Sequence, residues 1–149
     1  MCTNTAIGWI KLTVVICAFA AAQNARAEAY ILELEVVNVQ AGEGFLKIVL
    51  HDSESSYRDG DQIPFRSITV PVDREEHMTL QIEGVPPGRY AFIVYQDLNG
   101  NDDIDSNFIG WPKEPFGFSN NPPIRFGPPS FKKTFFEVTN NQRVRVELR

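Results

Sequence analysis

Residues 90–95 read YAFIVY, a short stretch without a charged side chain. Apolar or aromatic side chains stand at every position, so both alternating faces of the stretch are apolar. The turn signal Pro86-Pro87-Gly88 precedes it, and Asp97 follows it closely. A short run that is rich in β-branched and aromatic residues is typical of a strand buried on both faces. The sequence therefore predicts a central β-strand over 89–96.

Segments on both sides of this strand alternate apolar and polar residues. In 30–36, for example, Leu32 and Leu34 alternate with Glu33 and Glu35. A period of two with one polar face is typical of half-buried antiparallel strands. The predicted strands are 30–36, 46–51, 65–72, 77–83, 89–96, 131–138 and 143–148. These seven strands predict one all-β domain, an antiparallel β-sandwich of the immunoglobulin-like or transthyretin-like kind.

Residues 1–27 differ from the rest of the chain, because they contain neither Asp nor Glu. An apolar run over 12–22 precedes the small-residue site Ala25-Arg26-Ala27, an order typical of a secretory signal peptide. We expect cleavage after Ala27, a single domain of residues 28–149, and a periplasmic or secreted protein with no membrane span after cleavage. An uncleaved membrane anchor is the alternative, but the run is shorter than the roughly 20 residues that a spanning helix needs.

The expected mature domain, 28–149, contains no cysteine, since Cys2 and Cys17 both lie in the leader. A disulfide framework is therefore excluded, and packing or a bound ion must stabilise the domain. Its 19 acidic residues stand against 12 basic ones, the 14 of the whole chain less Lys11 and Arg26, which gives a net charge of −7. Without a basic stripe to neutralise phosphates, nucleic acid is not an expected partner.

One segment, 97–130, shows almost no strand pattern and holds six of the ten prolines. Loops of this length within a compact domain are usually functional or disordered. Disorder is disfavoured because the segment is rich in aromatic residues, so we expect it to pack on the sandwich. Trp111, Phe116 and Phe118 form the candidate surface for a glycan or for a segment of another envelope protein. The alternative is that these rings form the loop's own small core.

The same loop begins with oxygen-bearing side chains at every second position. They are Asp97, Asn99, Asn101, Asp103 and Asp105. Calcium takes six to eight oxygen ligands, and side chains at a spacing of two can converge on one ion. We therefore predict a structural Ca²⁺ site at these five residues, with Asp103 ligating through its backbone carbonyl and Asp105, Asn107 or Glu114 available to complete the shell. Magnesium suits the loop less well, because it requires a rigid octahedron.

The loop is not an EF-hand. Asp102 stands at the position that glycine takes in an EF-hand, Phe108 stands at the position of the bidentate glutamate, and no helices are expected on either side. The alternative interpretation is an Asx-rich turn whose side chains hydrogen-bond to their own backbone.

Motifs of common catalytic sites are absent from the sequence, including the nucleophile elbow, a phosphate-cradling loop and H-E-x-x-H. His51 and His77 are expected at outward positions of different strands. A second acidic loop is expected to be a solvated hairpin loop, although carboxylates that meet across loops can perform glycosidase chemistry. Its acidic residues are Asp52, Glu54, Asp59 and Asp61.

A dense set of motifs follows the central strand. The chain reads PPGRYA at 86–91, DLNGNDDID at 97–105, GWPKEPFGFSN at 110–120 and FGPPSF at 126–131. These motifs resemble those of a bacterial family called domain of unknown function 2141, with Gly110, Pro112, Glu114, 117–120 and 126–131 at matching positions. The resemblance implies an exported β-sandwich protein and no established activity. The family's usual loop has Asn-Gly where this chain has Asn101-Asp102, which places a non-glycine residue where a left-handed conformation is favoured.

The favoured hypothesis is a non-catalytic binding or accessory module with a structural calcium loop. One alternative is a carbohydrate-active or other hydrolytic enzyme that uses loop carboxylates. The other alternative is an envelope protein–protein interaction domain that holds no metal.

Overall fold

The computed structural model describes residues 28–59, 62–125 and 127–149. The predicted leader, 1–27, lies outside the described residues, as do Asp61 of the second acidic loop and Phe126 of the last family motif. None of the helices among the described residues combines the length and the apolar composition needed to cross a membrane.

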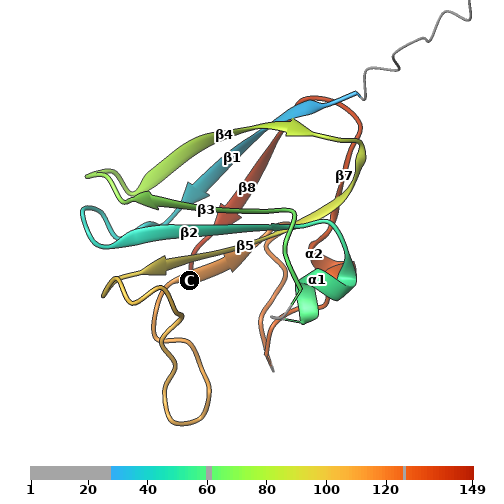
Figure 1. Ribbon diagram of the computed structural model, residues 1–149. Helices are drawn as coiled ribbons and strands as arrows, with labels where there is room; N and C mark the ends of the chain where they lie inside the picture. The colour runs from blue at the N-terminus through green and yellow to red at the C-terminus, as the bar shows by residue number, and fades with distance from the viewer. Residues whose placement is uncertain (1–27, 60–61, 126) are drawn as a thin grey trace, which may run out of the picture.

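The described residues form eight strands and two short helices (Figure 1). The strands are β1 (Tyr30–Val37), β2 (Phe45–His51), β3 (Arg66–Pro71), β4 (His77–Val85), β5 (Gly88–Asp97), β6 (Phe116–Phe118), β7 (Phe136–Val138) and β8 (Gln142–Glu147). The helices are α1 (Glu54–Arg58) and α2 (Phe131–Thr134).

The strands form two sheets, one with the order β4-β1-β8 and one with the order β3-β2-β5-β6, and β7 pairs with the start of β5. This arrangement confirms the predicted all-β sandwich. One pair departs from the antiparallel pattern, because β1 and β8 run parallel. The chain enters β8 beside the start of β1, where the Ile31 N–H donates to the Asn141 side chain at 2.8 Å, so both strands run in the same direction.

The hydrophobic core lies between the two sheets and contains the apolar residues of the alternating strands. Leu32, Leu34 and Val36 come from β1, Leu46, Ile48 and Leu50 from β2, Tyr90, Phe92 and Val94 from β5, and Val144 and Val146 from β8. Fully burying an aliphatic or aromatic side chain stabilises the fold by about 1.5–3 kcal/mol relative to leaving it exposed. The alternation read from the sequence therefore places these residues on the correct face.

The opposite face of the second sheet is also covered, which explains why β5 is apolar on both faces. In the register of β5 and β6, Tyr95 pairs with Phe116 and Ile93 pairs with Phe118. Directly paired residues share a face, so these two rings lie beside Ile93 and Tyr95 on the side away from the core. Gly117, between the two rings, faces inward, where a Cβ would lie 2.5 Å from the Glu147 carbonyl oxygen.

Three sequence predictions about local structure are wrong. The segment predicted as one strand over 131–138 is α2 followed by β7, because the Phe135 N–H bonds to the Phe131 carbonyl at 2.8 Å and closes a helical turn. The second acidic loop contains α1, which the Ser53 side chain caps by accepting the Ser56 N–H at 3.2 Å. His51 is buried and not outward, because Tyr57 of α1 packs on its ring at a centroid distance of 5.5 Å.

Candidate functional site

The long loop begins with a turn built around Asp97, the fully buried last residue of β5. Its carboxylate accepts hydrogen bonds from the backbone N–H groups of Gly100 at 2.8 Å, Asn101 at 3.2 Å and Asp102 at 2.9 Å. The ammonium of Lys47, from β2, lies 3.8 Å from the Asp97 carboxylate. Burial alone would raise the pKa of Asp97, but these N–H groups and Lys47 outweigh it and hold the pKa below its ordinary value. Asp97 is therefore an anionic centre that fixes the turn.

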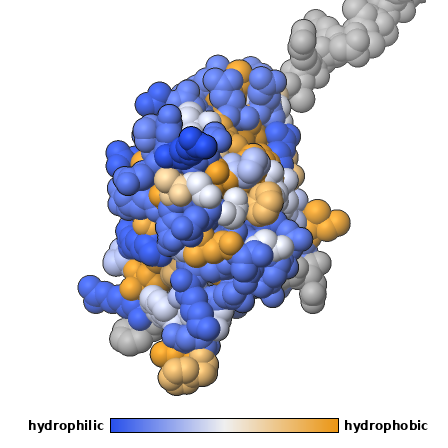
Figure 2. Space-filling view, turned by 90° about the vertical axis from the view of Figure 1, so that its left-hand side faces the viewer, coloured by the Kyte–Doolittle hydropathy of each residue, from blue (hydrophilic) through white to orange (hydrophobic). Residues whose placement is uncertain are grey.

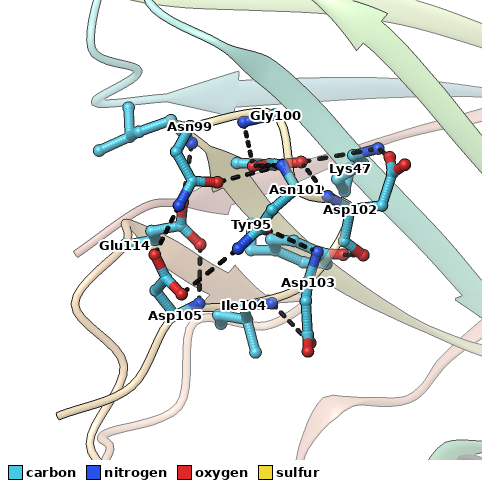
Figure 3. Close-up of polar contacts among 12 residues, drawn as sticks. Lys47, Tyr95, Asn99, Gly100, Asn101, Asp102, Asp103, Ile104, Asp105 and Glu114 are labelled. Atoms are coloured by element: carbon cyan, nitrogen blue, oxygen red, sulfur yellow. Dashed lines mark hydrogen bonds and ion pairs between the residues drawn. The ribbon is translucent and has the colours of Figure 1, made fainter.

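Asp102 has a left-handed backbone conformation, with φ of 66°, which glycine adopts most readily. Aspartate tolerates this conformation better than most residues. The Asp102 carboxylate also pairs with the Lys47 ammonium (Figure 3). Aspartate at this position therefore provides an ion pair that glycine could not form, at the cost of some backbone strain. Gly44, in the connection from β1 to β2, also has a positive φ, and a Cβ there would overlap the Asp97 carbonyl oxygen. The close approach of these two segments therefore requires glycine at position 44.

Glu114 joins the two ends of the turn. Only 5% of this residue is exposed, and its two carboxylate oxygens accept the N–H groups of Leu98 at 2.8 Å and Asp105 at 3.0 Å. The Lys113 N–H also donates to the Asp105 carbonyl at 2.7 Å. These bonds hold residues 113–114 beside the start of the loop, and they position the residues that follow Glu114.

The structure brings together three of the five predicted calcium ligands. The side-chain NH2 groups of Asn99 and Asn101 both donate to the Asp105 carboxylate, with N···O distances of 2.7 Å and 3.4 Å (Figure 3). The Asp97 carboxylate faces backbone N–H groups instead, and the Asp103 carboxylate accepts the N–H of Ile104 at 2.8 Å. Within the described residues, no group of three His, Cys, Asp or Glu side chains is placed to hold a metal ion.

The amide oxygens in this turn also bond to its own backbone. The Asn99 side chain accepts the Asn101 N–H at 3.1 Å, and the Asn101 side chain accepts the Asp103 N–H at 3.0 Å. These are the bonds of an Asx-rich turn. An oxygen with two lone pairs can accept an N–H and still face a cation, so the two interpretations share this geometry.

Beyond the turn, the loop covers the outer face of the second sheet and leaves an apolar pocket of about 350 Å³. The sheet contributes Ile93, Phe116 and Phe118 to it, and Tyr57 comes from α1. The remaining lining residues come from the long loop and are Ile104, Ser106, Gly110, Trp111, Pro112, Ile124, Gly127 and Pro128. Side chains distant in sequence therefore meet at one concave site.

The three candidate surface residues, Trp111, Phe116 and Phe118, all line this pocket. Trp111 and Phe116 have ring centroids 6.3 Å apart at 73°, and Phe116 and Phe118 lie 5.9 Å apart at 83°. Phe116 and Phe118 are buried, whereas 41% of Trp111 is exposed. The edge-to-face arrangement makes walls for a cavity and not a flat platform.

Two side chains that the sequence analysis did not place at a site, His51 and Tyr57, pack on each other beside the pocket. His51 is buried, its Nδ1 has no hydrogen-bond partner among the described residues, and burial lowers its pKa. The Tyr57 hydroxyl donates to the Pro129 carbonyl at 3.0 Å, and burial raises the pKa of this phenol. The capping pattern of Ser53 before α1 is the one sequence signal that could have placed Tyr57 here.

The other polar candidates lie apart from the pocket lining. The Asp52 carboxylate accepts the Ser56 hydroxyl at 3.4 Å, and Glu54 pairs with Arg58 at 4.0 Å on the surface of α1. His77 is exposed, as predicted, and lies 3.8 Å from the Glu75 carboxylate.

Comparison with known proteins gives one family. A family model described as an uncharacterized protein conserved in bacteria (DUF2141) matches residues 34–146. No curated protein and no solved structure matches the chain. The match spans the sandwich from β1 to β8 and includes the whole of the long loop.

Proposed function

The chain belongs to the DUF2141 family of uncharacterised bacterial proteins, and we propose that it is a non-catalytic binding module of the cell envelope. Its ligand site is the apolar pocket between the long loop and the outer face of the second sheet. The observation that carries this proposal is the pocket itself, whose volume of about 350 Å³ falls within the range of small-molecule sites. A rigid sandwich that holds a site on its loops is a common arrangement for binding.

The chemistry of the lining supports binding over catalysis. Tyr57 and Ser106 supply the hydroxyl groups of the lining, and the Tyr57 hydroxyl is already bonded to the Pro129 carbonyl. The carboxylates of the loop face the backbone of their own turn, as Asp97 and Glu114 do. A hydrolytic enzyme that uses loop carboxylates would need them at the pocket, so this alternative has less support.

The orientation of the rings supports an apolar ligand over a glycan. Sugars stack on exposed ring faces, whereas the rings of Trp111, Phe116 and Phe118 meet at 73° and 83° and enclose a hollow. An apolar ligand that enters such a hollow gains roughly 25 cal/mol for each square ångström removed from water. Export, the remaining part of the proposal, rests on the leader-like composition of 1–27.

We expect 1-octanol to bind in the pocket and to change the fluorescence of Trp111. Trp9 lies in the expected leader, so Trp111 is the single tryptophan reporter in the domain of residues 28–149. Ile124→Asp places a charge in the lining and should weaken octanol binding at least tenfold, because burying an unpaired carboxylate is costly. Ile63→Asp is the matched control, since Ile63 is 90% exposed. Unchanged emission and no heat of binding up to the solubility of octanol would refute the pocket as a ligand site.

A second candidate function, docking to another envelope protein, is favoured by the tip of the long loop. Phe108 is 99% exposed and Ile109 is 74% exposed. The Asn107 side chain holds this tip by accepting the N–H groups of Ile109 and Trp111 at 3.0 and 2.9 Å. The loop protrudes at the lower end of Figure 1, and Figure 2 shows apolar side chains at that end. An ordered, exposed apolar tip supports contact with a partner protein.

We also propose that the turn at 97–105 binds calcium in a structural role. The clustering of the Asn99, Asn101 and Asp105 side chains supports it, with the two amides turned in the bound state so that their oxygens face the ion in place of their N–H groups. The crowding of five carboxylates in and beside the turn also supports it, because the Lys47 ammonium pairs with two of them. These carboxylates belong to Asp97, Asp102, Asp103, Asp105 and Glu114. Asn99, Asn101 and Asp105 would hold the ion, with the carbonyl oxygen of Asp103 and an oxygen of Asp97 as further ligands. Bound calcium would neutralise the charge and fix the start of the long loop.

Thermal melts in a chelator and in calcium test this site. Calcium sites of extracellular modules have Kd values of about 10⁻⁴–10⁻³ M, and ligand at roughly 100 times Kd stabilises the folded state by about 2.7 kcal/mol. We expect calcium to raise the Tm of the unmodified protein and not that of Asp105→Asn. Asp59→Asn, in the other acidic loop, should keep the full calcium response. Identical melts of the unmodified protein with and without calcium would show that the turn is held by its hydrogen bonds alone.

A further inference from the structure

A second hollow of about 410 Å³ lies beside the apolar pocket. The two share Gly127 and Pro128 in their linings, so they lie side by side across this short segment. The second hollow differs in its charge, because Arg125 and Lys133 contribute to it together with Ser130 and several prolines. An apolar space is thus adjacent to a cationic one.

The basic character of this region contrasts with the rest of the domain. Residues 28–149 carry a net charge of −7, yet Arg125, Lys132 and Lys133 gather at the second hollow and on α2. All three are exposed, and none forms an ion pair with another described residue. Cations that no described carboxylate neutralises create a local positive potential in an acidic protein, and such a potential attracts anions.

We propose that the apolar pocket and the basic hollow together bind an amphiphile with one apolar tail and an anionic head. The tail lies against Trp111, Phe116 and Phe118, and the head, a carboxylate or a phosphate, lies beside Arg125 and Lys133. Arginine and lysine are the usual partners of both head groups. This inference rests on the proposed binding function, and it adds the chemical class of the ligand.

The tail and the head contribute separately to affinity. Each methylene removed from water strengthens binding roughly fourfold, so decanoate should bind about fifteen times more tightly than octanoate while the pocket still has space. Two exposed ion pairs should make octanoate bind about fivefold more tightly than octanol. Octyl phosphate should match or exceed octanoate, whereas inorganic phosphate alone should bind weakly because it has no tail.

Calorimetric titration of the full chain with these probes, below their micelle-forming concentrations, tests the inference. The double variant Arg125→Glu, Lys133→Glu should bind octanoate at least fivefold more weakly and leave octanol affinity unchanged. Arg74→Glu is the matched control, because this exposed residue lies in the connection from β3 to β4 and lines neither hollow. Octanoate affinity should also fall with added salt, and octanol affinity should not.

The outcomes separate the two proposals. Equal affinities for octanol and octanoate in the unmodified protein would overturn the anionic head and leave the pocket intact as a ligand site. An equal loss of octanoate binding in the Arg74→Glu control would also overturn it, since the effect would then come from overall charge. Failure of every probe to bind would refute the proposed binding function itself.

Discussion

Replacing Asp97 with alanine should lower the free energy of unfolding by about 3–5 kcal/mol, as the loss of one partner from a buried ion pair usually does. The Asp97 carboxylate accepts hydrogen bonds from three backbone N–H groups and lies 3.8 Å from the Lys47 ammonium. Lys47 is itself buried, with 8% of the residue exposed. The substitution leaves the three N–H groups without their buried acceptor, and of the two carboxylates that pair with Lys47 it leaves the exposed one of Asp102. Urea denaturation of the variant and of the unmodified protein measures the loss.

Asp103→Ala is the matched control for this experiment. Asp103 stands in the same turn, but its side chain is exposed and accepts only the N–H of the next residue, Ile104. Its removal should change stability by no more than about 0.5 kcal/mol, as is usual for surface positions. Equal losses in the two variants would show that acidity of the turn as a whole matters, and that Asp97 has no special role.

The pH dependence of the Asp97 effect provides an independent check. The pKa of Asp97 is lower in the folded protein than its ordinary value of 3.8, so the folded state binds this proton less readily than the unfolded state. The stabilisation is therefore complete above pH 3.8 and is lost as the pH falls through the folded pKa. The stability difference between the unmodified protein and Asp97→Ala should accordingly shrink below pH 3.8.

Period-two alternation predicted the core because it reports which face of a strand each residue occupies. It could not report what covers the other face. His51 alternates with core residues in β2 and was expected at the surface, yet Tyr57 covers it. Lys47, on the same face of β2, is covered by the loop at 97–102. The apolar outer face of β5 did indicate that something covers this side of the sheet, since a strand buried on both faces needs a second packing layer.

The candidate site was predictable in position but not in detail. Spacing of two in 97–105 predicted that five side chains converge on one ion, and the side chains of Asn99, Asn101 and Asp105 do lie together. The backbone N–H groups of the same turn compete for the Asp97 carboxylate, and sequence gives no measure of that competition. The pocket depends on contacts between α1, β5, β6 and the long loop, which are distant in sequence and therefore invisible to local patterns.

Replacing Phe116 with alanine should cost about 3–5 kcal/mol of unfolding free energy, as large aromatic truncations in cores do. Phe116 is 8% exposed, packs edge to face on both Trp111 and Phe118, and pairs with Tyr95 across β5 and β6. Its backbone also exchanges hydrogen bonds with Arg149 at 3.0 and 3.3 Å, which join β6 to the end of the chain. The cavity left by the ring would lie between the long loop and the sheet, so the loop would lose part of its attachment.

Three aromatic residues of the same loop provide an internal scale for this prediction, because their burial differs. Phe108 is 99% exposed, so Phe108→Ala should change the unfolding free energy by no more than about 0.5 kcal/mol. Replacing the partly exposed Trp111 with alanine should lower the unfolding free energy by about 1–2 kcal/mol, since only part of its area leaves water on folding.

Urea denaturation of the three variants measures these losses and gives their order directly. A Trp111 loss as large as that of Phe116 would mean that the pocket wall is core and closed to ligands, whereas a Phe116 loss as small as that of Phe108 would mean that the loop is not packed on the sheet. The expected order leaves Phe116 as the anchor of the loop and Trp111 as the wall that a ligand touches.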